Sequence, residues 1–303
     1  MRLVAPAVVL GEIARAVPAD CRENIIIIGS LAAGYHFFGS DPAMMVRTKD
    51  ADCLLSPRSR ALSAGVDITE RLFQERWRFR ADERWRQPGN ASTPDAALPA
   101  VRLNPPNTAD WFIELLAVPA SRADEGPQWT RIETAFGHFG LRSFRFLSLA
   151  AFEPIATPLG IHVARPNLMA LANLLEHPAV WPETMRGVVG DREIKRSNKD
   201  LGRVLAIARL TIGKNEDALL DWPAHWMSAL RRLFPEDWRE LASRCGHGLR
   251  ELLANPDDLD EASHTCEFGL LALQAPTAEQ LRLAGLRLLQ DAIDPLEQLA
   301  REA

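Results

Sequence analysis

Two aspartates, Asp50 and Asp52, stand one residue apart where a polar stretch turns apolar, in the run Asp-Ala-Asp-Cys-Leu-Leu. In a β-strand, residues two apart point to the same face, so the two side chains would project together with Cα atoms about 6.6 Å apart. Paired carboxylate oxygens are the ligands that Mg²⁺ prefers, and neither lysine nor histidine replaces them. The spacing therefore predicts a magnesium site at the start of a strand.

A third carboxylate would allow two metal ions, and the best candidate is Glu114, the lone charge inside the apolar run Phe-Ile-Glu-Leu-Leu. An ionised carboxylate buried without a partner costs several kcal/mol, so Glu114 should face a cation or lie at an open strand end. Two alternatives remain. Asp110 is the weaker third carboxylate, and Glu114 could instead form a salt bridge to one of the many arginines.

A phosphate site is expected next to these carboxylates. Residues 25–28 are four consecutive isoleucines, which are typical of a strand covered on both faces. Gly29 and Ser30 end the run, and the following residues 31–38 favour a helix. Since the first amide groups of a helix attract anions, we expect Gly29 and Ser30 to hold the outer phosphates of a nucleoside triphosphate.

These motifs resemble the nucleotidyltransferase superfamily that includes DNA polymerase beta. The resemblance rests on the Gly29-Ser30 turn, on residues 47–52 (Arg-Thr-Lys-Asp-Ala-Asp) and on the later strand carboxylate. Within the superfamily, the chain is most similar to the abortive-infection, AbiEii-like bacterial branch, because of residues 161–167 and 195–200. The similarity covers roughly residues 20 to 210.

The resemblance implies a mixed α/β catalytic domain and Mg²⁺-dependent transfer of a nucleoside monophosphate from ATP or another NTP. It also implies a cytoplasmic toxin or phage-defence component, with a cognate antitoxin protein as a partner. Lys49, Lys195 and Lys199 are the candidate charge partners of the triphosphate. Two positions depart from the branch: Asn173 stands where a lysine is usual, and Arg203 where a second aspartate is common.

Hydrophobic periodicity predicts an α+β fold, with strands and helices in residues 1–160 and a mainly helical domain in residues 161–303. The resemblance implies that the first part is a nucleotidyltransferase-type mixed sheet flanked by helices. Further expectations are helices over residues 7–17 and 60–80, strands over 101–103 and 138–147, and loops over 88–106 and 119–128. From Asn167 onward, leucine-rich helical periodicity dominates.

Composition limits the class of protein. The chain has 303 residues and a formal charge of −5, which argues against a polyanion-binding surface over the whole molecule but allows a local basic patch. No apolar run reaches the roughly 18 residues of a membrane span. Four cysteines without paired spacing fit a reducing compartment, and Cys-Gly-His and His-Thr-Cys at residues 245–247 and 264–266 lack a familiar zinc spacing. We therefore expect a cytoplasmic protein without membrane contact.

Residues 74–86 interleave arginines with tryptophans and phenylalanine. Such a segment could carry an RNA strand, because arginine binds phosphates and tryptophan stacks on bases. The favoured alternative is the end of an amphipathic helix with buried tryptophans, its arginines paired with Glu75, Asp82 and Glu83.

Two functions follow from the sequence. The first is an enzyme that uses Asp50, Asp52 and Glu114 with two Mg²⁺ ions to transfer a nucleoside monophosphate to RNA, a protein or a small molecule such as an aminoglycoside. The second is a protein of the same fold that binds nucleotides without turnover, as a sensor or partner subunit, which Asn173 and Arg203 favour.

Overall fold

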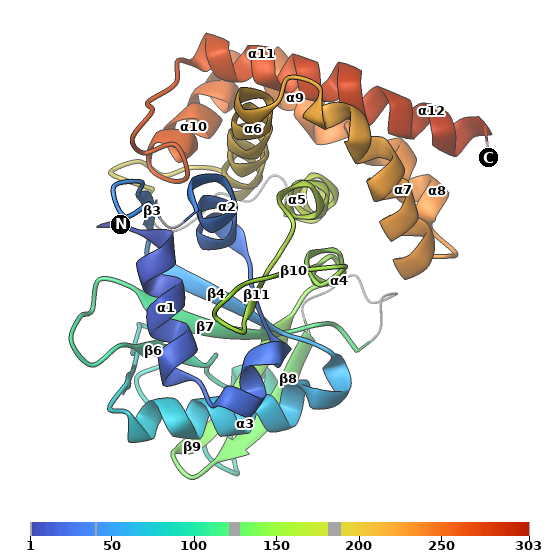
Figure 1. Ribbon diagram of the computed structural model, residues 1–303. Coiled ribbons are helices and arrows are strands. Elements are labelled where there is room, and N and C mark those ends of the chain that lie inside the picture. Colours follow the sequence, from blue (N-terminus) through green and yellow to red (C-terminus); the bar gives the residue numbers. More distant parts are fainter. Residues whose placement is uncertain (1, 40, 121–127, 181–188, 303) are drawn as a thin grey trace.

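The protein is described by a computed structural model that covers residues 2–39, 41–120, 128–180 and 189–302. It has a mixed α+β architecture, in which one large sheet carries helices on both faces and the C-terminal half is made of helices (Figure 1). The α+β class predicted from the periodicity is confirmed. None of the helices in the described ranges combines the length and apolar character that a membrane crossing requires.

The main sheet contains parallel and antiparallel neighbours. Its strand order is β10 (Ile155–Ala156), β11 (His162–Val163), β2 (Ile25–Ile27), β4 (Asp50–Leu55), β7 (Phe112–Ala117), β6 (Arg102–Asn104) and β5 (Arg78–Phe79). The hairpin of β8 (Gln128–Thr134) and β9 (Gly137–Ser143) joins the same sheet where β9 pairs with β7. The central strand β4 runs antiparallel to β2 and parallel to β7.

The isoleucine run forms the strand that the sequence predicts. All three residues of β2 are buried, which agrees with a strand covered on both faces. The chain then turns at Gly29, whose φ of +72° is a conformation that glycine adopts without strain. The helix that follows, α2 (Gly29–Phe38), begins two residues before the predicted start at Leu31.

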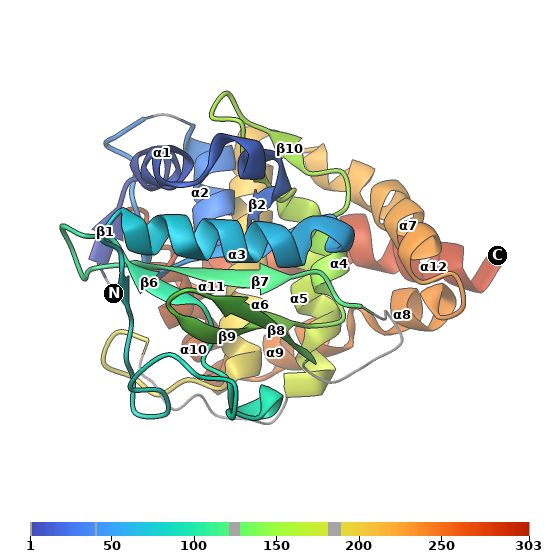
Figure 2. The same cartoon turned by 90° about the horizontal axis from the view of Figure 1, so that it is seen from below.

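The helices form two layers around the sheet. On one face, α3 (Arg58–Gln74) packs against β4, β7 and β8, while α2, α5 (Pro166–Val180) and α6 (Arg196–Lys214) lie on the other (Figures 1 and 2). The N-terminal helix α1 (Pro6–Ala16) matches its prediction within one residue. The predicted helix over residues 60–80 is too long, because Arg76 takes a φ of +66° and ends α3, and Trp77 then enters the core.

The remaining elements include strands that the sequence analysis missed. In the main sheet these are β5, β8, β10 and β11. The others are β1 (Arg2–Val4) and β3 (Val46–Thr48), which form a separate two-stranded sheet. The loop expected over residues 88–106 also contains β6, at the place of the predicted strand 101–103, and a short 3₁₀ turn over Asp95–Ala97. The predicted strand over 138–147 corresponds to β9, and most of the loop expected over 119–128 lies outside the described residues.

Helices dominate after β11, as predicted. Besides α5 and α6, they are α7 (Trp222–Leu233), α8 (Trp238–Arg244), α9 (His247–Ala254), α10 (Pro256–Glu267), α11 (Ala278–Leu288) and α12 (Asp294–Glu302). A short helix, α4 (Leu147–Ala150), precedes them. No strand follows β11 in the described part of the chain.

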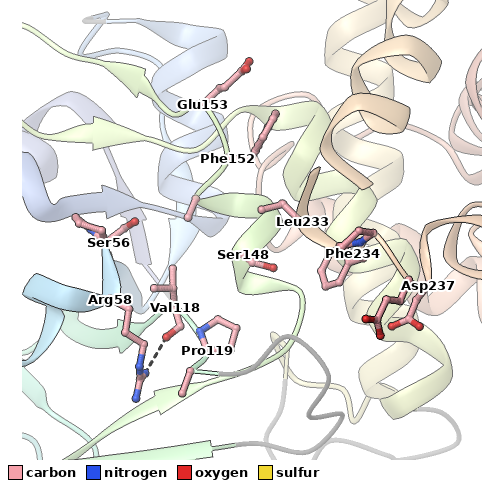
Figure 3. Close-up of a pocket in the computed structure, with 15 residues that line it drawn as sticks. Ser56, Arg58, Val118, Pro119, Ser148, Phe152, Glu153, Leu233, Phe234 and Asp237 are labelled. Carbon is pink, nitrogen blue, oxygen red and sulfur yellow. Dashed lines mark hydrogen bonds between the residues drawn. The ribbon is translucent and has the colours of Figure 1, made fainter. Parts of the chain in front are cut away.

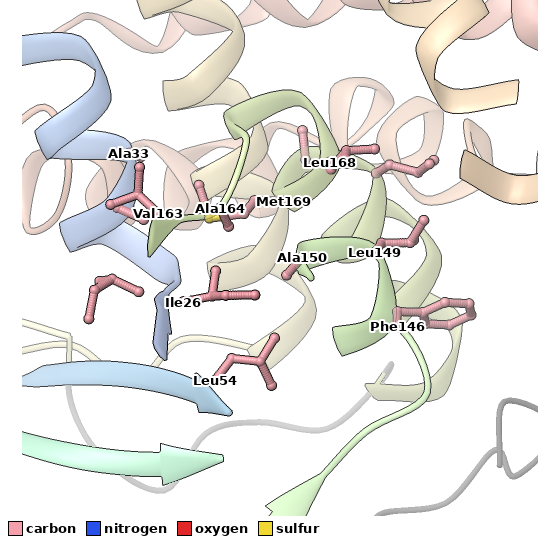
Figure 4. Packing of buried hydrophobic residues seen from close by; sticks show 14 of the residues in the cluster. Ile26, Ala33, Leu54, Phe146, Leu149, Ala150, Val163, Ala164, Leu168 and Met169 are labelled. Atoms are coloured by element: carbon pink, nitrogen blue, oxygen red, sulfur yellow. The ribbon is translucent and has the colours of Figure 1, made fainter. Parts of the chain in front are cut away.

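One hydrophobic cluster joins the sheet to the helices. Ile26 and Leu54 from the sheet, Ala150 from α4 and Leu168 and Met169 from α5 belong to it and lie close together (Figure 4). Since β11 also pairs with β2, the sheet continues just beyond residue 160. The division into residues 1–160 and 161–303 remains a prediction.

Candidate active site

The three candidate carboxylates lie on neighbouring parallel strands. Asp50 and Asp52 occupy positions one and three of β4, and Glu114 is the third residue of β7. In the register of these strands, Asp52 stands directly opposite Glu114. Backbones of adjacent strands are about 4.8 Å apart, so all three side chains originate from one small patch of the sheet.

A cavity of about 290 Å³ opens above this patch. It is lined by sheet residues and by facing surfaces of α5 and α6, so it lies where the sheet meets the helices. Its acidic lining residues are Asp50, Asp52, Glu114, Glu176 and Asp200, and its basic lining residues are Arg102, Arg142, Arg196, Lys199 and Arg203. This arrangement suits a ligand that carries negative charge and also binds through a cation.

The turn between β2 and α2 approaches the cavity at Gly29. The Ile28 amide donates to the carbonyl oxygen of Asp52 at 3.0 Å, which extends the β2–β4 ladder up to the turn. A Cβ atom at Gly29 would lie 3.3 Å from Oδ2 of Asp52. Both this contact and the positive φ favour a glycine, and the backbone here passes close beside the carboxylate. Ser30 sits in the first turn of α2 but does not line the cavity.

Of the three carboxylates, Asp52 has the fewest partners to stabilise its negative charge. No hydrogen bond reaches its side chain from any residue that the structure describes. Burial, followed by repulsion from Asp50 and Glu114, holds its pKa well above the ordinary range, although Arg203 and Lys199 act in the opposite direction. A carboxylate in this state gains from any cation that enters the cavity. Asp50, by contrast, accepts a 2.9 Å hydrogen bond from Oγ1 of Thr48.

Glu114 is held by arginines. Its side chain is only 7% exposed, and its Oε2 accepts a 2.8 Å hydrogen bond from Nε of Arg102. Nη1 of Arg142 lies 3.6 Å from the other oxygen, Oε1. The alternative of a salt bridge to an arginine is therefore confirmed. Asp110 instead pairs with Arg2 at 2.8 Å, and the cavity lining does not include it.

The residues fit a magnesium ion in part. Asp50 and Asp52 supply the oxygen donors that Mg²⁺ prefers, and Asp52 lacks another partner. In the described residues, however, no three His, Cys, Asp or Glu side chains form a ready ligand group. Glu114 would join such a group only after leaving Arg102. Around residues 245–266, the described side chains form no such group either. All four cysteines are buried free thiols.

The predicted lysines lie in different places. Lys199 lines the cavity from α6, where burial and then the neighbouring Arg203 lower its pKa. Lys195, one residue before α6, forms a 2.6 Å ion pair with Asp258 and does not line the cavity. Lys49 is exposed between β3 and β4 and is likewise absent from the lining.

Several lining residues were missed from the sequence. Arg196 and Arg203 lie on α6 at helical spacing from Lys199, which was predicted, so charges on one helix face would have grouped all three. Arg203, noted above only as a departure, is the strongest cationic influence on Asp52. On α5, Asn173 and Glu176 also line the cavity, and burial and then Asp200 raise the pKa of Glu176 to about 7.

A larger hollow of about 740 Å³ lies elsewhere, between the start of α3, the end of β7 and the turn after α7 (Figure 3). Arg58 in this hollow already donates to the carbonyl of Val118 and to Oγ1 of Thr130, each at 2.9 Å. The carboxylates in its lining are those of Glu153, Glu236 and Asp237. The combination of buried acidic and basic side chains is found in the smaller cavity above β4 and β7.

Comparison with known proteins yields no match to this chain among family models, curated proteins or solved structures. What the chain does must therefore be argued from its own residues. The cavity above β4 and β7 is the strongest basis, because five acidic and five basic side chains converge there, counted from its lining.

Proposed function

We propose that the protein is a Mg²⁺-dependent nucleotidyltransferase related to the AbiEii-like branch, which transfers a nucleoside monophosphate from an NTP to an acceptor hydroxyl. The observation that carries the proposal is the placement of Asp50 and Asp52 on β4 opposite Glu114 on β7, beside the Gly29 turn. A toxin or phage-defence role, with an antitoxin partner, belongs to the same proposal.

Two parts of the cavity suit the triphosphate. The backbone at Gly29 and Ser30 opens α2, and amide groups at a helix start attract phosphate oxygens. Across the cavity, Lys199 and Arg203 supply positive charge from one face of α6. We include Lys199 and Arg203 in the phosphate site and leave Lys195 outside, since its ammonium group is bound to Asp258.

Asp50 and Asp52 would hold the metal. Mg²⁺, when bound, neutralises phosphate charge and positions the α-phosphate for in-line attack. The unpartnered state of Asp52 supports this assignment, because a cation would offset the burial and the like charges that raise its pKa. The acceptor oxygen forms a bond to the α-phosphorus, the bond to the β-phosphate oxygen breaks, and pyrophosphate leaves.

Glu114 would accept the proton of the acceptor hydroxyl. For this role it must exchange the guanidinium of Arg102 for the acceptor. A bound triphosphate supplies a reason for that exchange, because its oxygens compete for the same guanidinium donors. Arg142, which lies farther from the carboxylate at 3.6 Å, could keep Glu114 oriented meanwhile.

The second candidate is a nucleotide-binding protein without transfer activity. It is favoured by one observation, the pairing of Glu114 with two arginines, which leaves this carboxylate unavailable in the conformation described. Asn173 adds to it, because its amide donates to the Met169 carbonyl at 2.9 Å and brings no charge to the cavity.

One experiment separates the two functions. Purified protein is incubated with each α-labelled NTP, Mg²⁺ and total RNA, and the label is followed into RNA, protein and small molecules. Transfer by wild type but not by an Asp50→Asn variant supports the enzyme. Saturable NTP binding without transfer under any of these conditions supports the binding protein and refutes the transferase.

A further inference from the structure

Residues 74–86 do not extend α3 but cross the edge of the sheet. After Gln74 the chain turns, β5 pairs with β6, and a loop then brings Trp85 against Trp129 of β8. The helical path that the alternative expected for this segment is thus wrong, although Trp77 is buried as it expected. What remains is an arrangement of arginines and aromatic rings, which we call the arginine–aromatic tract: Arg80, Arg84, Arg102, Arg142, Trp85, Phe112, Trp129 and Phe144.

Guanidinium groups and rings alternate along the tract. Arg80 and Arg102 lie over the Phe112 ring at 4.4 and 5.9 Å, and Arg84 and Arg102 over the Trp85 ring at 4.7 and 5.7 Å. The two indoles are 6.0 Å apart edge to face. On the other side, Arg142 lies over Trp129 and Phe144 at 5.3 and 5.1 Å.

The positive charge of this segment is not neutralised locally. Arginines 76, 78, 80, 84 and 86 form no salt bridge with any residue in the described ranges. The pairing with Glu75, Asp82 and Glu83 that the sequence suggested is therefore not found: Glu75 pairs with Arg71, and Asp82 with Arg102 at 3.4 Å. In a protein with a formal charge of −5, these arginines form a local basic surface, and two of them, Arg80 and Arg84, belong to the tract.

The tract leads into the candidate active site. Arg102, Arg142 and Phe144 belong to the tract and also line the cavity, and the two arginines contact Glu114. Arg84 is exposed, and the Trp85 and Trp129 side chains are partly exposed. A ligand along the tract would therefore meet alternating charge and ring surface and end beside the carboxylates.

We propose that the arginine–aromatic tract binds a single-stranded nucleic acid and presents its end to the cavity. Guanidinium groups suit its phosphates, and aromatic or guanidinium planes suit its unpaired bases. That this end is the acceptor of the transfer reaction rests on the proposed function; binding along the tract does not. An acidic protein would satisfy the arginines but leave the rings without a specific use.

Binding is measured by fluorescence anisotropy with the full chain, without NTP. The probes are a labelled single-stranded RNA of about a dozen nucleotides, the DNA strand of the same sequence, and an abasic strand with the same phosphates. Each is titrated at several salt concentrations. The RNA or DNA strand should bind more tightly than the abasic strand, and whichever binds better identifies the nucleic acid.

Two variants separate charge from stacking. Trp85→Ala should weaken binding roughly 5- to 150-fold, the usual loss for one stacked base, with little change in salt dependence. Arg84→Ala should reduce the slope of log affinity against log salt by about 0.7, one phosphate contact. Should Trp85→Ala fail to fold, Arg84→Lys is measured in its place. The lysine keeps the positive charge of Arg84 but lacks the planar guanidinium group.

The matched control is Arg231→Ala, which removes another guanidinium that lies 4.5 Å from a tryptophan ring, that of Trp238, outside the tract. It should leave binding unchanged.

Equal affinity for the abasic strand would overturn the proposal in favour of a general polyanion or acidic-protein surface. So would wild-type binding by the Arg84 and Trp85 variants. If the protein binds RNA but transfers no nucleotide, only the proposed transferase activity is refuted. If it transfers nucleotide without binding RNA, only the proposed binding of nucleic acid along the tract is refuted.

Discussion

Replacing Glu176 by glutamine should remove a pH dependence from the stability of the folded chain. The side chain lies in the cavity wall on α5, where burial and then Asp200 raise its pKa from 4.5 to about 7, while Arg196 acts against them. At about 1.36 kcal/mol per pKa unit, this rise corresponds to about 3 kcal/mol. That amount is the cost of ionising Glu176 in the folded state.

The sign of the effect follows from proton binding. Between pH 4.5 and about 7 the folded state holds a proton that the unfolded chain has lost, so the free energy of unfolding falls as the pH rises through this window. Above pH 7 the full cost of about 3 kcal/mol remains. A glutamine has the same size and no charge, so the Glu176→Gln variant should become more stable than wild type as the pH increases.

The assay is urea unfolding at pH 5 and pH 8. The stability difference between Glu176→Gln and wild type should grow by about 2.5 kcal/mol between these two values, because a part of the effect is already present at pH 5. Glu23→Gln serves as the control, because Glu23 is exposed and should show no such change. If wild type and Glu176→Gln lose stability in parallel over this range, the cavity does not hold Glu176 in the environment described.

Three further predictions concern the same cavity. Asp52→Asn should abolish transfer yet stabilise the fold at neutral pH, since burial and like charges disfavour the ionised carboxylate; labelled-NTP assays and thermal melts test both effects. Lys199→Ala and Arg203→Ala should each weaken NTP binding by about 1.5 to 3 kcal/mol in calorimetry, while Lys195→Ala should not, and the reverse pattern would refute the phosphate site. Gly29→Ala should cost roughly 1 to 3 kcal/mol in urea unfolding, because φ is +72° and the new Cβ would lie 3.3 Å from Asp52.

Elements with a strong local signal were predictable. Four isoleucines predicted a strand, and three of them form β2; the alternation in Asp50–Leu55 predicted β4. Elements defined by distant partners were not. The strand β8 has a mixed polar sequence that becomes a strand by pairing with β9 along its whole length, and β1 depends on β3, more than forty positions away in the sequence.

The same distinction applies to the site. The period of a strand placed Asp50 and Asp52 on one face, and the isolation of its charge singled out Glu114. The arginine that holds Glu114 could not be chosen from the sequence, because Arg102 reaches it through strand order: β6 pairs with β7 so that these two residues stand opposite each other. Glu176 was missed for a similar reason, since its neighbours Arg196 and Asp200 come from α6.

Asn173 and Arg203 are best considered together. In the sequence, Asn173 stands where the AbiEii-like branch usually has a lysine, and Arg203 stands where it commonly has an aspartate. In the structure both line one cavity, with Asn173 on α5 and Arg203 on α6. The amide of Asn173 is satisfied by its own helix, whereas Arg203 lies near enough to Asp52 to oppose the rise of its pKa. A positive charge is therefore present in this cavity but is carried by a different helix, which is why the Arg203→Ala variant tests the phosphate site more directly than any change at Asn173.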